Sequence, residues 1–337
     1  MNTGNYKEFT LIERLKKCVT GAGNFVIIGV GDDAAALKVN EGRIILMTAD
    51  SMVEGVHFDL SFVPYSDLGW RAMTANLSDV AAMGGRPIGA TVCICVPPSC
   101  AAESLEELYV GMDAVASRFE CRIVGGDTTS SHSDLAISIS LLGEVEHERL
   151  TPRSKVKPGD LLCVTGHLGG SRAGLEVLQR RKLGVPLPGS FEEAVNRYLH
   201  PIPRLKESAV MGDTVPIHAA IDISDGISSE IHHLCRMSQV GARIESGAIP
   251  LHPDTRGVAR LCNQNAHSFA LSGGEDFELL FAVDSRDAKI VSDAVERETG
   301  TPISVVGEAV PRDQGVSIRD KGEAWRPLED AGFKHFL

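Results

Sequence analysis

The sequence predicts an α+β fold in which mixed sheets are flanked by helices and the chain forms two domains. Strand and helix patterns follow one another without strict alternation, which argues against a doubly wound parallel sheet. The turn Asn40-Glu41-Gly42 separates two apolar strand patterns and predicts a hairpin. The polar stretch 146–160, EHERLTPRSKVKPGD, is the best candidate for a domain junction. We therefore expect an N-terminal domain at residues 1–150 and a C-terminal domain at residues 151–337.

The elements expected before the junction begin with an amphipathic helix over residues 7–19, where apolar residues recur on one face. A buried strand follows, and then the two strands of the hairpin. Two further helices are expected at 66–83 and 103–119, and a glycine pair ends the first of them. The expected strands are 25–30, 34–39, 43–50, 87–96, 122–126 and 135–145.

After the junction, apolar runs predict strands at 161–166, 219–223 and 303–310. The segment 268–283, SFALSGGEDFELLFAV, predicts two strands around a glycine turn. The expected helices are 171–181, a proline-interrupted region reaching about Met211, 226–237 and 286–298. This order again mixes strands and helices without a βαβ repeat.

Composition excludes several functional classes. A formal net charge of −12 argues against nucleic acid or an anionic membrane as the main partner. No apolar run approaches the roughly 20 residues of a membrane span, and the N-terminus lacks a signal-peptide core. The eight cysteines form no C-x-x-C pair, so we expect small buried side chains in a reducing cytoplasm and no zinc site. An acidic protein still binds nucleotides where metal ions reverse the local charge.

Seven aspartates lie at the ends of apolar strands or in glycine-rich turns, in five separate segments. The segments are GVGDDAA (Asp32, Asp33), LMTADS (Asp50), NLSDVAAMG (Asp79), VGGDTT (Asp127) and IDISDG (Asp222, Asp225). Loops at one sheet edge tend to converge on a shared site, and converging carboxylates repel unless cations lie between them. Carboxylate oxygens suit Mg²⁺, which commonly accompanies phosphates. The pattern therefore indicates a magnesium-dependent enzyme of phosphate chemistry.

Familiar nucleotide motifs are absent or misleading. Residues 29–34, GVGDDA, match the dinucleotide fingerprint G-x-G-x-x-A, but a hairpin follows where that fold needs a helix. The chain has no P-loop, and it lacks the H-R-D and D-F-G segments of protein kinases. We therefore expect any ATP to be held by metals and carboxylates.

Each segment also has a purely structural interpretation. Asp32 and Asp33 suit an ordinary turn, and Ser224 or Asp225 suits a helix N-cap. The turn 166–171, GHLGGS, precedes a helix and is only a weak candidate for anion binding. His57 follows Asp50 closely enough to share its site, although a satisfied structural histidine is an equal alternative.

Long motifs in order along the chain resemble the thiamine-monophosphate kinase family. They are GVGDDAA, GVHF after the strand ending in Asp50, NLSDVAAMG, GGDTT, KPGDLLCVTG, IDISDG, LSGGEDFELLF and GFKHF. This family belongs to an ATP-binding group with aminoimidazole ribonucleotide synthetase and selenophosphate synthetase. The resemblance implies the two-domain aminoimidazole ribonucleotide synthetase-like fold and a homodimer formed through the N-terminal sheets. It implies ATP-dependent phosphorylation of thiamine monophosphate, the final step of thiamine diphosphate biosynthesis.

The resemblance also implies roles for individual residues. Mg²⁺ ligands would be Asp33, Thr48, Ala49, Asp50, Asp79, Asp127, Asp222 and Asp225. ATP would meet Gly126, Asp127, Arg153 and Ser224, and thiamine monophosphate would meet His57, Glu275 and Phe333. Asp32 is a further ligand or an orienting neighbour. No catalytic base is expected, because the acceptor phosphate is already largely dianionic at pH 7.

One position departs from the family pattern, which has a hydroxyl residue where this chain has Ala49. Either that contact runs through the backbone carbonyl, or one metal is held more weakly here. Two other functions remain as alternatives: another ATP-dependent enzyme of the same superfamily, and a non-catalytic sensor of ATP and Mg²⁺.

Overall fold

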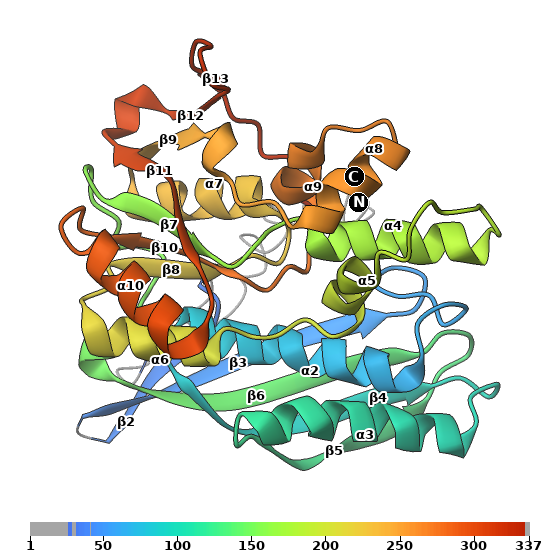
Figure 1. The fold of residues 1–337 in the computed structure, drawn as a ribbon. Helices are drawn as coiled ribbons and strands as arrows, with labels where there is room; N and C mark the ends of the chain where they lie inside the picture. Colours follow the sequence, from blue (N-terminus) through green and yellow to red (C-terminus); the bar gives the residue numbers. More distant parts are fainter. Residues whose placement is uncertain (1–25, 29–31, 41, 334–337) are drawn as a thin grey trace, which may run out of the picture.

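We describe the protein from a computed structural model, which covers residues 26–28, 32–40 and 42–333. The helix expected at 7–19 lies outside these residues. Two sheets with their helices form two domains, one on either side of the segment 146–160 (Figure 1). None of the described helices combines the length and the apolar character needed to cross a lipid bilayer.

The N-terminal sheet has six strands in the order β1-β2-β3-β6-β4-β5. Only β4 and β5 run parallel to each other, and the remaining pairs are antiparallel. The strands are β1 Val26–Ile28, β2 Ala35–Asn40, β3 Arg43–Val53, β4 Arg86–Val96, β5 Arg122–Ser130 and β6 Ala136–Glu146. The predicted hairpin of β2 and β3 is confirmed, and the strand β2 begins at Ala35, where a dinucleotide-binding fold would have a helix.

Helices α2 (Tyr65–Ala82) and α3 (Ala102–Arg118) cover one face of this sheet, as predicted. The two helices pack at very short range because each presents a glycine to the backbone of the other. A Cβ at Gly69 would lie 2.0 Å from the carbonyl oxygen of Leu108, and one at Gly111 would lie 1.8 Å from that of Ser66. The opposite face carries no described helix, and we call it the outer face.

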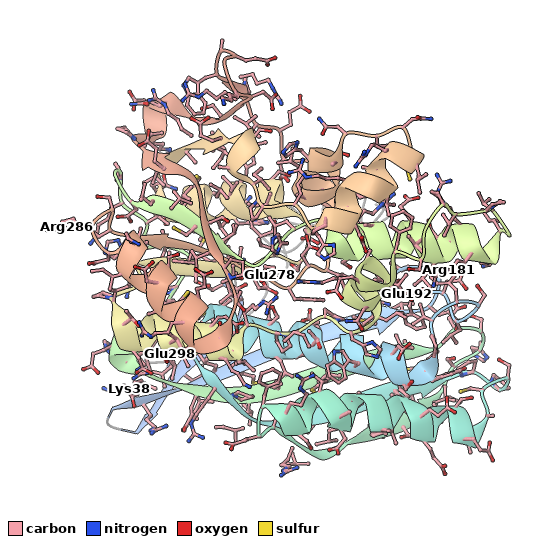
Figure 2. The ribbon with its side chains drawn as sticks, viewed as in Figure 1. Lys38, Arg181, Glu192, Glu278, Arg286 and Glu298 are labelled. Atoms are coloured by element: carbon pink, nitrogen blue, oxygen red, sulfur yellow. The ribbon has the colours of Figure 1, made fainter. Side chains whose placement is uncertain are left out.

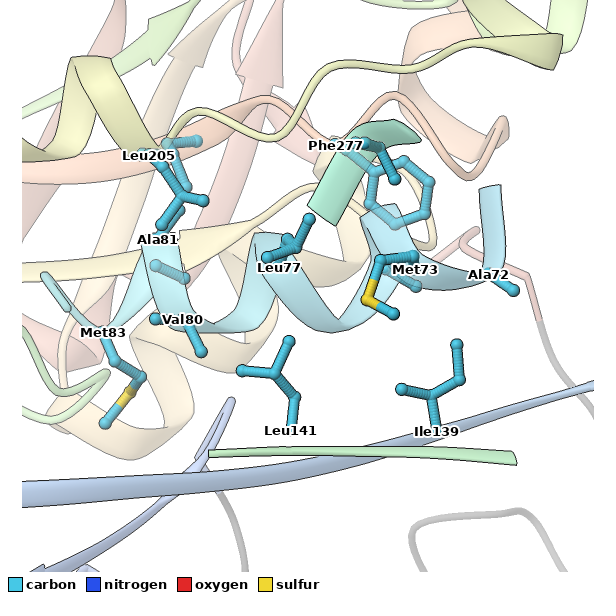
Figure 3. Packing of buried hydrophobic residues seen from close by; sticks show 14 of the residues in the cluster. Ala72, Met73, Leu77, Val80, Ala81, Met83, Ile139, Leu141, Leu205 and Phe277 are labelled. Atoms are coloured by element: carbon cyan, nitrogen blue, oxygen red, sulfur yellow. The ribbon is translucent and has the colours of Figure 1, made fainter. Parts of the chain in front are cut away.

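Helix α2 is buried on both sides because it lies between the N-terminal sheet and the C-terminal domain. Its apolar residues contact Ile139 and Leu141 of β6 on one side (Figure 3). Leu205 and Phe277 of the C-terminal domain lie on the other side (Figure 3). A helix enclosed in this way carries its polar side chains into the interface between domains, which is where the candidate site forms.

The C-terminal sheet has seven strands in the order β13-β12-β9-β11-β7-β10-β8. It is also mixed, since β12 and β9 are parallel and the other neighbours are antiparallel. The strands are β7 Leu161–Thr165, β8 Ala219–Asp222, β9 Gly241–Glu245, β10 Leu279–Val283, β11 Ile303–Val310, β12 Val316–Arg319 and β13 Arg326–Pro327. The α+β class with mixed sheets is therefore confirmed.

The C-terminal helices agree with the prediction except in two places. They are α4 Gly170–Lys182, α5 Glu192–Leu199, α6 Leu205–Thr214, α7 Ile227–Ser238, α8 Pro253–Leu261, α9 Ala266–Ser272 and α10 Ala288–Thr299. Helix α8 was not expected. The prediction of a strand at the start of SFALSGGEDF was wrong, because Asn265 accepts a hydrogen bond from the backbone N–H of His267 and caps α9.

The prediction that the cysteines are buried holds for only part of the set. Cys121, Cys163 and Cys235 are buried, whereas Cys93 is exposed on the outer face. The outer face also exposes several large apolar side chains, between two-fifths and three-quarters accessible: Ile27, Met47, Ile88, Val124 and Leu142.

Candidate active site

A cavity of about 360 Å³ opens between the two domains. The N-terminal domain contributes the end of β3, the loop after it and α2. The C-terminal domain contributes the start of α4, the loop after β8 and the glycine-rich loop before β10. Site residues predicted from both halves of the sequence line its wall: Asp50, His57, Asp79, Asp222, Ser224, Asp225, Glu275 and Phe333.

An acidic cluster of four aspartates adjoins the cavity: Asp50, Asp79 and Asp222 line the wall, and the buried Asp33 lies beside them. Oxygens of Asp33, Asp79 and Asp222 lie within 4.8 Å of one another. Asp50 lies on the buried side of β3, which continues beyond the predicted strand end to Val53, and it is close to Asp79. These hard oxygen donors fit a divalent cation such as Mg²⁺, because an ion among them would be bound by several carboxylates at once.

Hydroxyl and guanidinium groups hold the carboxylates in place. Thr48 Oγ1 donates to Asp79 Oδ2, and Ser78 Oγ donates to Asp222 Oδ2 at 2.7 Å. Arg153 pairs with Asp33 through both oxygens, at 2.7 and 2.6 Å. Its backbone N–H also donates to Asp32 at 3.2 Å. Each oxygen of Asp33 keeps a second lone pair, so the pairing with Arg153 does not exclude a metal.

Burial and mutual repulsion disfavour the ionised forms of Asp32, Asp79 and Asp222. Burial, followed by the charges of Asp50, Asp222 and Asp33, raises the pKa of Asp79 well above its usual value. Burial and then Asp33 do the same to the pKa of Asp222. Burial and Asp33 raise the pKa of Asp32 to about 7. A bound cation would favour the ionised carboxylates, so raised pKa values in such a cluster are typical of a cation site.

The geometry of β3 bears on the unusual residue Ala49. Side chains alternate along the strand, so the buried Thr48 and the partly buried Asp50 face α2. Ala49 lies between them, and its side chain is exposed on the outer face. A hydroxyl at this position would also point away from the carboxylate cluster, which favours a contact through the backbone carbonyl.

The loop after β8 differs from the N-cap interpretation of its sequence. The N-cap residue of α7 is Gly226, with φ of 112°, instead of Ser224 or Asp225. The backbone N–H groups of Ser224 and Asp225 both donate to the buried carboxylate of Glu230, at 3.2 and 2.8 Å. Those two N–H groups are therefore not available to a ligand. Ser224 and Asp225 nevertheless line the cavity.

His57, Glu275 and Phe333 come together from three distant segments. The backbone N–H of Val53 donates to His57 Nδ1 at 3.0 Å, so the neutral ring carries its proton on Nε2. The Glu275 N–H donates to the carbonyl of Ser224 at 2.7 Å, which joins the two C-terminal loops. The Phe333 N–H donates to the carbonyl of Asp225 at 3.1 Å and holds this residue at the cavity.

Two acids after Glu275 serve the scaffold. Asp276 accepts hydrogen bonds from the N–H groups of Gly169 and Ser171. Its carboxylate therefore occupies the start of α4, where the sequence indicated a weak anion-binding site. Glu278 is fully buried and accepts from Arg204, Arg197 and Thr165. It lies deep in the molecule, whereas charged residues such as Arg286 and Glu298 lie at the periphery (Figure 2).

Gly126 and Asp127 do not line the cavity. In the ladder between β4 and β5, Asp127 is aligned with Cys93, and both side chains are exposed. Gly126 packs so closely on β4 that a Cβ would lie 1.9 Å from the carbonyl oxygen of Val92. Within one chain, the structure therefore separates these two residues from the other predicted site residues.

Sequence reasoning also missed residues at the site. Tyr198 and Arg172 line the cavity, and the fully buried Arg71 lies immediately behind its wall. Arg71 stands in an apolar helix, as Asp79 does, so the argument that singled out Asp79 would also have found it. Tyr198 gives no such signal, because its helix is amphipathic and one buried aromatic residue there is ordinary.

The fold and the cavity together define a two-domain protein of the AIR synthase related class. The family model for the AIR synthase related protein N-terminal domain matches residues 31–145, and the model for the C-terminal domain matches residues 157–320.

Comparison with individual proteins narrows this class. The chain is 31% identical to the thiamine-monophosphate kinase of Bacillus subtilis (strain 168), covering 92% of this chain and 94% of that one. It is 33% identical to that of Escherichia coli (strain K12), covering 98% of each. A solved structure described as AaThiL complexed with AMPPCP and TMP superposes with a TM-score of 0.85 at 30% identity, over 100% of this chain and 99% of that one. The chain belongs to the thiamine-monophosphate kinase family.

Proposed function

We propose that this protein transfers the γ-phosphoryl group of ATP to thiamine monophosphate and forms thiamine diphosphate. The observation that supports the proposal is a shared cavity in which an acidic cluster adjoins His57, Glu275 and Phe333. The structurally similar AaThiL complex contains an ATP analogue and TMP, which agrees with two phosphate-bearing ligands in one site. An enzyme that draws on cellular ATP is expected in the cytoplasm.

We propose that the aspartates hold several Mg²⁺ ions. Asp33, Asp50, Asp79 and Asp222 would contribute carboxylates, with Thr48 orienting Asp79, Ala49 contributing its carbonyl and Asp225 holding a further ion. Bound Mg²⁺ would offset the repulsion between the two phosphate groups and the charge on the transferring group. Asp32 would hold the backbone of Arg153, whose guanidinium fixes Asp33.

The protein's own residues would then contribute to phosphoryl transfer by positioning ATP and the acceptor and by supplying charged groups around them. The acceptor phosphate needs no general base, because its second pKa lies near 6. Ser224 and Arg153 are proposed to contact ATP, while His57 Nε2–H, Glu275 and Phe333 position the acceptor. Transfer would be direct and in line, without a phosphorylated side chain.

The test is incubation of the protein with Mg-ATP and thiamine monophosphate, followed by chromatographic detection of thiamine diphosphate. We expect one ADP for each thiamine diphosphate and no product in excess EDTA. ADP formation only with a different phosphate acceptor would indicate another reaction of the superfamily. ATP binding without turnover of any acceptor would indicate a sensor.

We also propose a homodimer formed through the outer face, with residues 1–150 as the dimerising domain and residues 151–337 completing the site. The exposed apolar side chains of β1 to β6 support this proposal, since large apolar patches are uncommon on monomers. Gly126 and Asp127, proposed to contact ATP and metal, belong to this domain, and Asp127 is exposed on the outer face.

Met47→Glu places a charge within that patch and should convert a dimer into monomers in analytical ultracentrifugation. Val110→Glu is the matched control, because Val110 is 65% exposed on α3, away from the outer face. A wild-type protein that is monomeric at micromolar concentration would contradict the proposed dimer.

A further inference from the structure

Arg71 is a fully buried cation between the two domains. It lies on α2, and its side chain has no solvent exposure. Its Nη2 donates to Glu275 Oε2 at 2.5 Å and to the backbone carbonyl of His57 at 3.2 Å. Its guanidinium carbon lies 4.1 Å from the centre of the Tyr198 ring. One guanidinium thus contacts three residues that line the acceptor side of the cavity.

The Arg71 side chain is poorly suited to a purely structural role. Burial lowers the pKa of Arg71, and Glu275 together with Tyr198 more than offsets this effect. Its Nε and Nη1 find no hydrogen-bond partner within residues 26–28, 32–40 and 42–333. A buried ion pair with unsatisfied donors is often no more stable than apolar side chains of similar volume. A methionine would fill the same space without burying those donors.

The charge of Arg71 acts most directly on Glu275. This carboxylate lines the same cavity as Asp50, Asp79, Asp222 and Asp225. Arg71, a cation behind the wall, pairs with Glu275 and occupies its Oε2. The other oxygen, Oε1, has no hydrogen-bond donor within the described part of the chain, and the side chain is one-quarter exposed.

We propose that Arg71 is a positioning residue for the phosphoryl acceptor. It holds Glu275 as an oriented carboxylate, and it ties Glu275 to the loop of His57 across the domain interface. This inference rests on the proposed function, because the acceptor would then carry an aminopyrimidine ring, which donates hydrogen bonds, and a thiazolium cation. Oε1 of Glu275 would accept from the amino group or face the cation.

The proposal is tested with Arg71→Met, Arg71→Lys, Glu275→Gln and the double variant Arg71→Met/Glu275→Gln. We expect Arg71→Met to raise the KM for thiamine monophosphate by about tenfold or more, the scale expected when one partner of a hydrogen-bonded charge pair is removed. The KM for ATP should change by less than about threefold, since the hydrogen bonds of Arg71 go to Glu275 and His57, not to Ser224 or Arg153. Arg71→Lys should recover part of the loss because it keeps the charge.

The double variant distinguishes a positioning role of Arg71, exerted through Glu275, from a general contribution of Arg71 to the stability of the fold. If Arg71 acts through the charge of Glu275, Arg71→Met should add little to the effect of Glu275→Gln. Lys182→Met is the matched control, because it breaks another ion pair between the domains, with Asp59, that is exposed and does not include Glu275. It should leave the KM for thiamine monophosphate within about twofold of the wild-type value.

Equal increases in both KM values, or additive effects in the double variant, would overturn the proposal. So would an Arg71→Lys variant no better than Arg71→Met. Should Arg71→Met fail to fold, the Arg71→Lys and Glu275→Gln pair still provides the comparison. Calorimetric binding of thiamine monophosphate, which needs no turnover, distinguishes the two failures: a wild-type protein that binds none of it refutes the proposed function itself.

Discussion

The substitution Asp79→Asn should stabilise the metal-free protein while removing most of its activity. Two unit charges 4.8 Å apart repel by about 3 kcal/mol at an effective dielectric constant near 20. The neighbouring Arg153 and partial protonation reduce the relief, so we expect about 1–2 kcal/mol of added stability. The isosteric amide can still accept the hydrogen bond of Thr48 through its oxygen.

The pH dependence of this effect follows from the raised pKa of Asp79. The folded protein binds more protons at this residue than the unfolded chain, whose carboxyl pKa is near 3.9. The stability of the metal-free protein therefore falls as the pH rises from about 4 towards the folded-state pKa. Asp79→Asn removes this part of the slope, so its advantage over the wild type should be larger at pH 8 than at pH 4.

The assay is thermal unfolding in EDTA at several pH values, together with thiamine diphosphate formation in Mg²⁺. We expect a melting temperature raised by roughly 2–6 °C at pH 8 and activity reduced by at least about 100-fold. Asp213→Asn is the control, because it neutralises an exposed aspartate that pairs with Arg149. A melting temperature more than about 5 °C below the wild type, or activity within tenfold of it, would refute the reasoning.

Three other outcomes are expected. Phe333→Ala should raise the KM for thiamine monophosphate more than that for ATP in steady-state kinetics, and the reverse order would remove Phe333 from the acceptor side. Mg²⁺ binding should release protons and tighten as the pH rises, because the pKa values of Asp79 and Asp222 are raised in the metal-free protein; calorimetric heats identical in buffers of different ionisation enthalpy would contradict this. Gly111→Ala should destabilise the protein by about 2 kcal/mol or more in urea unfolding, because its Cβ would lie 1.8 Å from the Ser66 carbonyl oxygen, and an unchanged midpoint would show that α2 and α3 separate easily.

Much of the fold could be predicted because local patterns agree with the final structure. The hairpin of β2 and β3 follows from its turn residues, and α2 follows from apolar periodicity and the glycine pair after it. The segment SFALS defeated the same reasoning, because its apolar alternation fits a strand while the cap at Asn265 selects a helix. Helix α8 begins with Pro253 after His252, a start that the apolar pattern alone does not reveal.

The candidate site was predictable in composition but not in arrangement. Aspartates at strand ends can be read from the sequence because glycine and apolar neighbours mark them. Whether two of them share a cavity depends on which face of a strand each side chain occupies. Asp50 and the exposed Asp127 show this difference, since only Asp50 lines the cavity of its own chain. Partners such as Arg153 with Asp33 depend on tertiary contacts more than 100 residues apart in the chain.

Helix α2 carries the acceptor's positioning residue Arg71 and the carboxylate Asp79 eight positions apart. At 1.5 Å per residue, these positions are separated by about 12 Å along the helix axis. Because the N-terminal sheet and the C-terminal domain enclose the helix on both sides, the distance between Arg71 and Asp79 is fixed. Helix α2 therefore fixes the distance between the two ends of the site. The site should then select acceptor molecules by their length. A shorter acceptor held by Glu275, beside Arg71, would not bring its phosphate to the carboxylate cluster, whatever its charge.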